Sequence, residues 1–215
     1  MSDRQHTIRP TYVWEAPVRI WHWLMAVAMV VLAATGYLVG TPLPAIGGEA
    51  YDHFMLGYIR FAHFAAAYVF AVTFVLRVIW AFFGNRYSRE IFLVPLKMFT
   101  PSWWSGFIKQ TMHYLFLRRE VQPWLGHNPL AMSAMFFMYV LGTVFMICTG
   151  FALYGEAQGM QSLTFTLFTS WVMPLFGYSQ NVHTLHHLGM WYLLVFTIVH
   201  IYMVIREDIM SGETV

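Results

Sequence analysis

Long apolar stretches alternate with polar segments along the chain. Each stretch approaches or exceeds the roughly 20 residues that an α-helix needs to cross a bilayer. None shows the alternation of apolar and polar positions, over about ten residues, that a membrane β-strand would have. The pattern therefore predicts an all-α fold, an integral membrane four-helix bundle. The expected spans of this single membrane domain, 1–215, are residues 18–40, 57–83, 130–154 and 185–205.

The connecting segments differ in their content of basic residues. Residues 84–129 contain several Lys and Arg residues, whereas residues 41–56 and 155–184 contain none. Basic residues mark the cytoplasmic side of a membrane protein, so the middle loop, the N-terminus and the C-terminus are expected to be cytoplasmic. Within the middle loop, residues 102–117 have the pattern of an amphipathic interfacial helix, with Trp103, Trp104 and Phe107 expected at the lipid headgroups. A partly buried loop is the alternative for this segment.

Composition agrees with a membrane location and excludes several kinds of chemistry. Hydrophobic residues make up 59% of the chain and charged residues only 10%, against about 25% in soluble domains. The net charge of +2 is small and the basic residues lie in loops, so no nucleic-acid partner is expected. The single cysteine, Cys148, excludes an internal disulfide and an iron–sulfur cluster held by this chain alone. The sequence has no Cys-x-x-Cys-His motif, so any haem is bound non-covalently.

Histidines near the span ends are the main candidates for chemistry, because ionisable residues inside spans are rare and usually functional. They are His22, His63, His186 and His200. The expected topology places the first and the last of these toward the inner side of the membrane, and they are called the inner pair below. It places the other two toward the outer side, and they are called the outer pair.

Helical phase supports this pairing. His186 and His200 are fourteen residues apart, so they project from nearly the same face of one helix, roughly 21 Å apart along its axis. This separation suits two haems stacked across a membrane. His187 lies about 140° from that face and is not expected to be a ligand. Iron held by two neutral imidazoles has no open position, which favours electron transfer over oxygen chemistry. The sequence therefore predicts two haem b groups, each held by two axial histidines on facing helices.

Other interpretations of these histidines stay open at the level of the residues. Each could be a hydrogen-bonded polar group at a helix interface. A metal-ion transporter could bind its cation through them, although transporters usually show internal repeats, broken helices or acidic residues within the spans. A membrane anchor without a redox role is a third possibility. The role of His183, one turn before His186, is open as well.

Four further residues are expected in the haem environment. Gly36 follows His22 by fourteen residues and would let a porphyrin approach the helix backbone at the outer depth, with ordinary close packing of helices as the alternative. Arg77 lies at the inner depth and is expected to pair with an anionic haem propionate. Arg19 and Arg60 each precede a ligand histidine by one turn. They would either pair with propionates or anchor the span ends in the headgroup region.

Several motifs resemble those of one family of membrane proteins. They are Arg19-Ile20-Trp21-His22-Trp23-Leu24, Thr35-Gly36, the run from His183 to Trp191, His200, Gly57-Tyr58-Ile59-Arg60, the run from Gly84 to Glu90, Gly126-His127-Asn128-Pro129, and the run from Arg206 to Met210. Together they cover nearly the whole chain and resemble the b-type cytochrome subunit of membrane-bound, quinone-reactive nickel–iron uptake hydrogenases. The cytochrome b subunit of a related formate dehydrogenase is an alternative, against which the loop motifs argue.

This resemblance implies the partners and the direction of electron flow. The partners would be the small and large subunits of a nickel–iron hydrogenase outside a bacterial inner membrane, in which this multi-pass chain would lie. Electrons from the hydrogenase iron–sulfur chain would reach the outer pair, cross to the inner pair and reduce quinone, a diffusible acceptor. The chain itself would carry out no hydrogen chemistry. The quinone site is expected at the inner side near His127, and a higher oligomer of the complex is left open.

Overall fold

The computed structural model describes residues 12–44, 53–119, 124 and 126–211, and these residues form helices and no strand. The α-helices are α1 (Ala16–Gly40), α2 (Met55–Phe83), α3 (Val94–Lys97), α4 (Pro101–Tyr114), α5 (Pro129–Ala134), α6 (Leu141–Gln158), α7 (Ser170–Phe176) and α8 (Ser179–Ser211). Two π-helical segments, Met135–Val140 and Phe165–Thr169, precede α6 and α7.

Four of the described helices are long and apolar enough to cross a membrane. They are α1, α2, the continuous helix Pro129–Gln158 that joins α5 to α6, and Ser179–Glu207 within α8. The all-α fold with four long apolar helices is therefore confirmed, and each expected span lies inside one of these helices. Proline occupies one of the first two positions of α1, α4 and α5, where its missing N–H costs no helical hydrogen bond.

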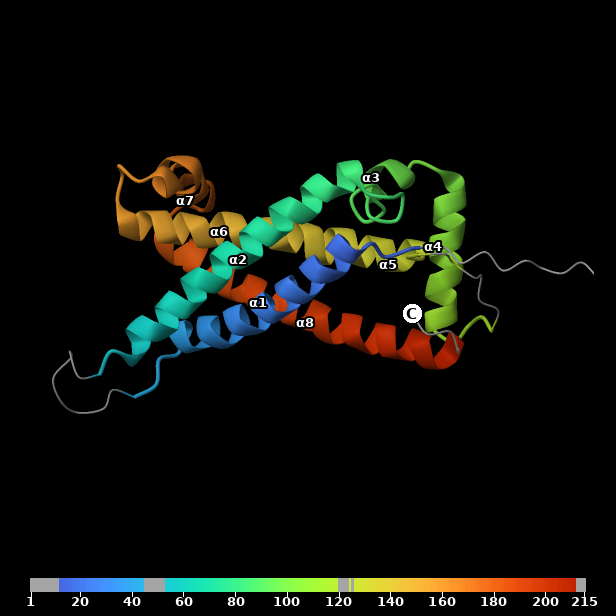
Figure 1. The fold of residues 1–215 in the computed structure, drawn as a ribbon, viewed down its shortest axis with the longest axis horizontal. Coiled ribbons are helices and arrows are strands. Elements are labelled where there is room, and N and C mark those ends of the chain that lie inside the picture. The colour runs from blue at the N-terminus through green and yellow to red at the C-terminus, as the bar shows by residue number, and fades with distance from the viewer. Residues whose placement is uncertain (1–11, 45–52, 120–123, 125, 212–215) are drawn as a thin grey trace, which may run out of the picture.

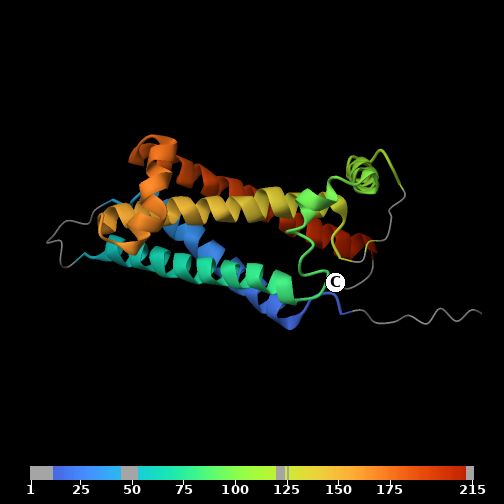
Figure 2. The same ribbon diagram turned by 90° about the horizontal axis from the view of Figure 1, so that it is seen from above.

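The four long helices form two crossed pairs. Among these four, α1 packs mainly against α2, and α6 packs mainly against α8. The two views show the pairs as two layers (Figures 1 and 2). Between the layers lies an apolar core with Met25 of α1, Phe74 of α2 and Val140 at the end of the first π-helical segment. Burial of these apolar side chains stabilises the contact between the two layers.

Large apolar side chains cover much of the outer surface of the bundle. Trp23 of α1 is 68% exposed, and Val30 and Ile198 are similarly exposed. A soluble monomer rarely shows apolar surface on this scale. On helices of this length, the exposed face is suited to contact with lipid.

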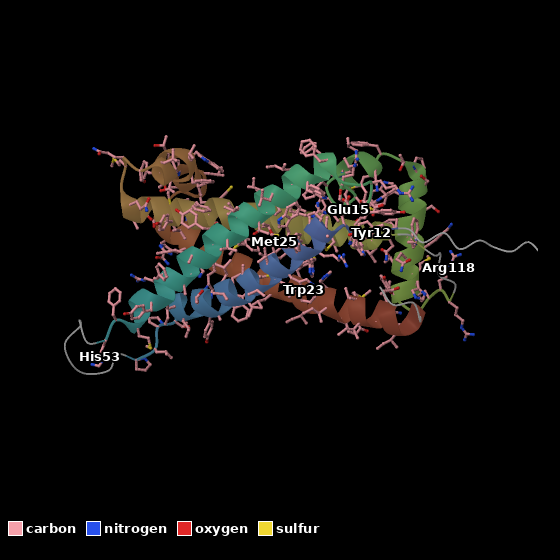
Figure 3. The ribbon with its side chains drawn as sticks, in the orientation of Figure 1. Tyr12, Glu15, Trp23, Met25, His53 and Arg118 are labelled. Atoms are coloured by element: carbon pink, nitrogen blue, oxygen red, sulfur yellow. The ribbon has the colours of Figure 1, made fainter. Side chains whose placement is uncertain are left out.

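Glu15 connects the beginning of α1 to the end of α2. Its Oε2 atom accepts hydrogen bonds from Trp80 Nε1 and from the Asn85 backbone N–H, both at 3.0 Å. Figure 3 shows Glu15 and Tyr12 at the end of the bundle opposite His53. This contact sets the depth of the first two helices relative to each other, because the start of one is fixed to the end of the other.

The segment between α2 and α5 crosses one end of the bundle, where α4 runs from the region of α3 to the end of α8 (Figure 1). α4 begins at Pro101 and ends at Tyr114, three residues before the expected end of the interfacial helix. Trp103 is buried against Val94 and Met132, so it contacts protein. The amphipathic pattern predicts contact with lipid headgroups instead. Trp104, in contrast, is exposed.

Candidate functional site

The two histidines of the inner pair face each other across the bundle. His22 projects from α1 and His200 from α8, and their ring centroids are 6.4 Å apart with a 52° angle between the ring planes. An imidazole nitrogen binds a metal ion at about 2 Å, so two rings on opposite sides of one iron have centres about 6 Å apart. The spacing of this pair therefore fits one iron atom between the rings. Two ligands suit a porphyrin, which supplies the remaining four.

Aromatic side chains support His200 from one side. Phe196, one turn earlier on α8, stacks on the His200 ring with a centroid distance of 5.6 Å. Tyr139 stacks on Phe196 at 5.8 Å, and its hydroxyl lies 3.0 Å from Met25 Sδ. Tyr139 belongs to the π-helical segment Met135–Val140, and such segments often mark functional sites. The stack limits the orientations that the His200 ring can adopt.

Arg77 is buried near this stack with one nitrogen left without a partner. The residue is 8% exposed, its Nη2 donates to the Ser88 carbonyl oxygen, and its guanidinium lies over the Phe92 ring. Its Nη1 has no hydrogen-bond partner. A buried guanidinium N–H without an acceptor is unfavourable, so this atom fits an anionic group such as a haem propionate.

The outer pair is held by hydrogen bonds to threonines on neighbouring helices. His63 Nδ1 lies 2.9 Å from Thr35 Oγ1 of α1, and His186 Nδ1 lies 2.8 Å from Thr149 Oγ1 of α6. The two imidazoles are close enough to interact electrostatically. Both rings are partly buried, and each uses its Nδ1 atom for the threonine. The Nε2 atoms remain as the nitrogens that can bind a metal.

Gly36 lies directly against a ring of the outer pair. A Cβ atom added to Gly36 would be 3.2 Å from His63 Cε1 and 3.7 Å from Met190 Sδ. The structure thus gives this glycine a contact with the histidine of α2, in addition to the expected approach of a porphyrin to the backbone. Gly150 of α6 has the same relation to His186, whose Cε1 would lie 3.0 Å from an added Cβ.

The remaining candidates lie apart from the two pairs. Arg19 and Arg60 are exposed, and Arg19 Nη2 lies 3.4 Å from the hydroxyl of Tyr12. This exposure agrees with side chains that reach the headgroup region. His187 accepts a hydrogen bond from Trp191 Nε1 at 3.2 Å, and a Cβ on Gly40 would contact its ring. The environment of His187 therefore differs from that of its neighbour His186. His183 is exposed.

His127 lies near the inner pair. Its imidazole contacts the Trp14 ring edge-to-face at 4.8 Å, and its Nδ1 is 3.9 Å from Glu90 Oε2. It is also close enough to His200 to interact with it electrostatically. The preceding Gly126 has a φ of 87°, which favours glycine. The turn therefore places the His127 imidazole beside the Glu90 carboxylate, in the region where the quinone site is expected.

Asn128 and Tyr114 close this end of the site. Asn128 Nδ2 donates to the Tyr114 hydroxyl at 3.2 Å, and the Arg206 guanidinium lies over the Tyr114 ring at 5.1 Å. Burial raises the pKa of Tyr114, which favours the neutral phenol. These contacts connect α4, the turn before α5, and the end of α8.

Sequence reasoning missed several residues of the site. Thr149, Gly150, Tyr139 and Phe196 all touch a candidate ligand or its neighbour. One signal was available, because the dipeptide Thr-Gly occurs both at 35–36 and at 149–150. The partner of each threonine, however, lies on another helix and is brought near only by the fold.

Comparison with known proteins agrees with the resemblance seen in the motifs. Residues 13–215 match the sequence model described as prokaryotic cytochrome b561. A protein of Azotobacter vinelandii named probable Ni/Fe-hydrogenase B-type cytochrome subunit is 52% identical, covering 99% of this chain and 89% of the relative. A relative of the same name in Cupriavidus necator is 53% identical over 97% of this chain and 84% of its own length. The probable Ni/Fe-hydrogenase 1 B-type cytochrome subunit of Escherichia coli strain K12 is 48% identical over 100% and 91%. The predicted family resemblance is thus confirmed.

Proposed function

Because the chain belongs to the prokaryotic cytochrome b561 family, we propose that it is the di-haem membrane subunit of a nickel–iron hydrogenase and passes electrons to quinone. The relatives carry the name of Ni/Fe-hydrogenase B-type cytochrome subunit, and a b-type cytochrome holds non-covalent haem. The observation that supports two haems is the presence of two histidine pairs, of which the inner pair has its rings 6.4 Å apart.

Each part of the site has a separate task in this proposal. His22 and His200 hold the inner haem, and His63 and His186 hold the outer haem. Arg77 offers its free Nη1 to a propionate of the inner haem, and Phe196 keeps the His200 ring in place. When bound, haem supplies reversible one-electron redox chemistry. Two histidines per iron leave no open coordination position, so the chain itself carries out no hydrogen chemistry.

The proposed orientation in the membrane is supported by the loops. Basic residues gather in the middle loop, and we propose that this end of the bundle faces the cytoplasm of a bacterial cell. The hydrogenase subunits are placed at the opposite end, near the outer pair. We propose a quinone site at the inner end, where His127 interacts with His200 of the inner pair and has the Glu90 carboxylate beside it.

The absorption spectrum of the purified chain tests the central claim. Reduction with dithionite is expected to give a b-type haem band, and a haem assay is expected to give two haems per chain. A spectrum without that band would contradict the proposal, and one haem per chain would contradict the di-haem assignment.

Histidine variants test the pairing. Replacing His63 and His186 together with Ala is expected to remove one haem and leave the other. The pair His22 and His200 is expected to give the complementary result. His187→Ala is the matched control, because this ring neighbours His186 in sequence but hydrogen-bonds Trp191 instead. If His63→Ala and His186→Ala each removed a different haem, the pairing would be refuted.

A further inference from the structure

The hydroxyl group of Thr35 makes two short contacts with different chemistry. Its Oγ1 lies 2.6 Å from the carbonyl oxygen of Val31, one turn earlier on α1, and 2.9 Å from His63 Nδ1 of α2. A carbonyl oxygen has no hydrogen to donate. Two oxygens this close need a hydrogen between them, so the single hydroxyl hydrogen of Thr35 must point to Val31.

This arrangement fixes the position of the hydrogen on the His63 ring. With its own hydrogen used, the Thr35 oxygen can only accept, and His63 Nδ1 must therefore carry the ring hydrogen. A neutral imidazole with hydrogen on Nδ1 has an unprotonated Nε2. That nitrogen is the one free to bind a metal. Thr35 thus selects the tautomer in which His63 can be an axial ligand through Nε2.

The same construction occurs a second time on the other layer of the bundle. Thr149 Oγ1 lies 2.8 Å from the carbonyl oxygen of Phe145 and 2.8 Å from His186 Nδ1. The same reasoning places a hydrogen on His186 Nδ1 and leaves its Nε2 unprotonated. In both places a glycine, Gly36 or Gly150, follows the threonine and gives space to the ring.

We propose that Thr35 and Thr149 are positioning residues that fix the tautomer and orientation of the two outer histidines and set the reduction potential of the outer haem. This inference rests on the proposed function, because it assumes that the outer pair holds a haem. A hydrogen bond from the non-ligating nitrogen makes the ligating nitrogen a stronger electron donor. A stronger donor stabilises the oxidised iron, so the two threonines are expected to keep the outer potential low.

Removal of the hydroxyl group tests the proposal. Thr35→Val and Thr149→Val keep the shape of the side chain but remove the hydroxyl oxygen that accepts the Nδ1 hydrogen. Redox titration of each variant, followed in the haem absorption band, is expected to show an upward shift of one of the two potentials. Both variants are expected to shift the same potential, and haem retention in detergent is expected to weaken by about 10-fold or more. Thr35→Ser and Thr149→Ser keep the hydroxyl and are expected to restore the wild-type potential.

Thr197→Val is the matched control. The Thr197 hydroxyl also donates to a carbonyl one turn earlier, that of Leu193 at 2.8 Å, but its other contact is Met29 Sδ and not a histidine. Its replacement is expected to leave the potential that responds to Thr35 and Thr149 unchanged. Should a valine variant fail to accumulate, the alanine variant at the same position is measured in its place.

The outcomes separate this inference from the function on which it rests. A wild-type chain without haem would overturn both. A wild-type chain with two haems, and threonine variants whose potentials are unchanged or shift different haems, would overturn the inference alone. Serine variants that behave like the valine variants would overturn it too, because the effect would then come from packing and not from the hydroxyl.

Discussion

At the scale of single residues, glycine has a defined task where a histidine ring lies directly on a helix backbone. A Cβ on Gly36 would be 3.2 Å from His63 Cε1, and one on Gly150 would be 3.0 Å from His186 Cε1. These distances are shorter than ordinary van der Waals contacts, so each ring would have to move away from the helix. We expect Gly36→Ala and Gly150→Ala to lower the haem content of purified protein from two haems toward one.

Gly142→Ala is the control for this prediction. A Cβ there would also lie 3.0 Å from the end of the flexible Leu193 side chain and 3.3 Å from the Tyr192 ring, neither of which is a candidate ligand. The leucine can rotate without moving a ligand, so haem content is expected to stay at the wild-type value. An equal loss of haem in all three variants would show that the loss comes from general packing.

Arg77 is the other residue whose replacement has a clear expected result. Its Nη1 is buried without a partner, and the proposed propionate would satisfy it. Arg77→Gln removes the charge and is expected to weaken retention of the inner haem by about 10-fold, since charge-assisted hydrogen bonds contribute about 1.5–3 kcal/mol. Haem loss to an excess of apomyoglobin measures this retention. Arg86→Gln, at an exposed position, is expected to have no effect. If Arg77→Gln retained the inner haem as well as the wild type does, Arg77 would not belong to the haem site.

At the scale of elements, the contact of Glu15 between α1 and α2 determines how the two helices align. The carboxylate accepts hydrogen bonds from Trp80 Nε1 and the Asn85 N–H. Glu15→Ala leaves both donors without their acceptor and is expected to lower stability by about 1–3 kcal/mol. Thermal unfolding in detergent, followed by circular dichroism, measures the effect as a lower midpoint. Glu156→Ala at the other end removes an exposed contact with Ser179 and is expected to have little effect. A midpoint unchanged by Glu15→Ala would contradict the role of this contact.

The sequence contained enough information for the elements but not for their packing. The length of each apolar stretch predicts the four spans, and the fourteen-residue spacing of His186 and His200 predicts their common face, because both depend only on regular helix geometry. The pairing of α1 with α2 and of α6 with α8 depends on side-chain packing across the bundle. The π-helical turn that places Tyr139 on Phe196 depends on tertiary contacts as well, so no local sequence pattern predicts it.

The residues of the candidate site also divide into those that the sequence predicts and those that only the packing of the helices brings together. The four candidate histidines could be proposed from sequence, because an ionisable side chain inside a span is rare. Thr35 and Thr149 could not be assigned to them, since threonine in a helix commonly bonds only to the carbonyl one turn earlier. Trp103 illustrates the opposite error. Its amphipathic pattern suggested lipid contact, but α3 and α5 cover it.

At the scale of the whole molecule, the proposed hydrogenase and quinone sides depend on which end of the bundle faces the cytoplasm. α4 and α7 lie at opposite ends of the bundle (Figure 1). His22 of the inner pair stands near the start of α1, close in sequence to Trp14, which contacts His127, whereas His63 of the outer pair stands near the start of α2. The positive-inside rule predicts that the end with α4 faces the cytoplasm. An inverted chain would exchange the proposed hydrogenase and quinone sides, so the orientation needs its own test.

Cysteine labelling provides that test, because the chain has only Cys148, which can first be replaced with Ser. Single cysteines are then introduced at two exposed positions, Ser105 in α4 and Gln161 in the segment before α7. A membrane-impermeant maleimide added to intact spheroplasts is expected to label Gln161→Cys and not Ser105→Cys, and in inverted vesicles the result should be reversed. Both positions are labelled after detergent treatment if the cysteines are accessible. Labelling of Ser105→Cys in intact spheroplasts would place α4 outside, and the inner pair would then face the hydrogenase instead of quinone.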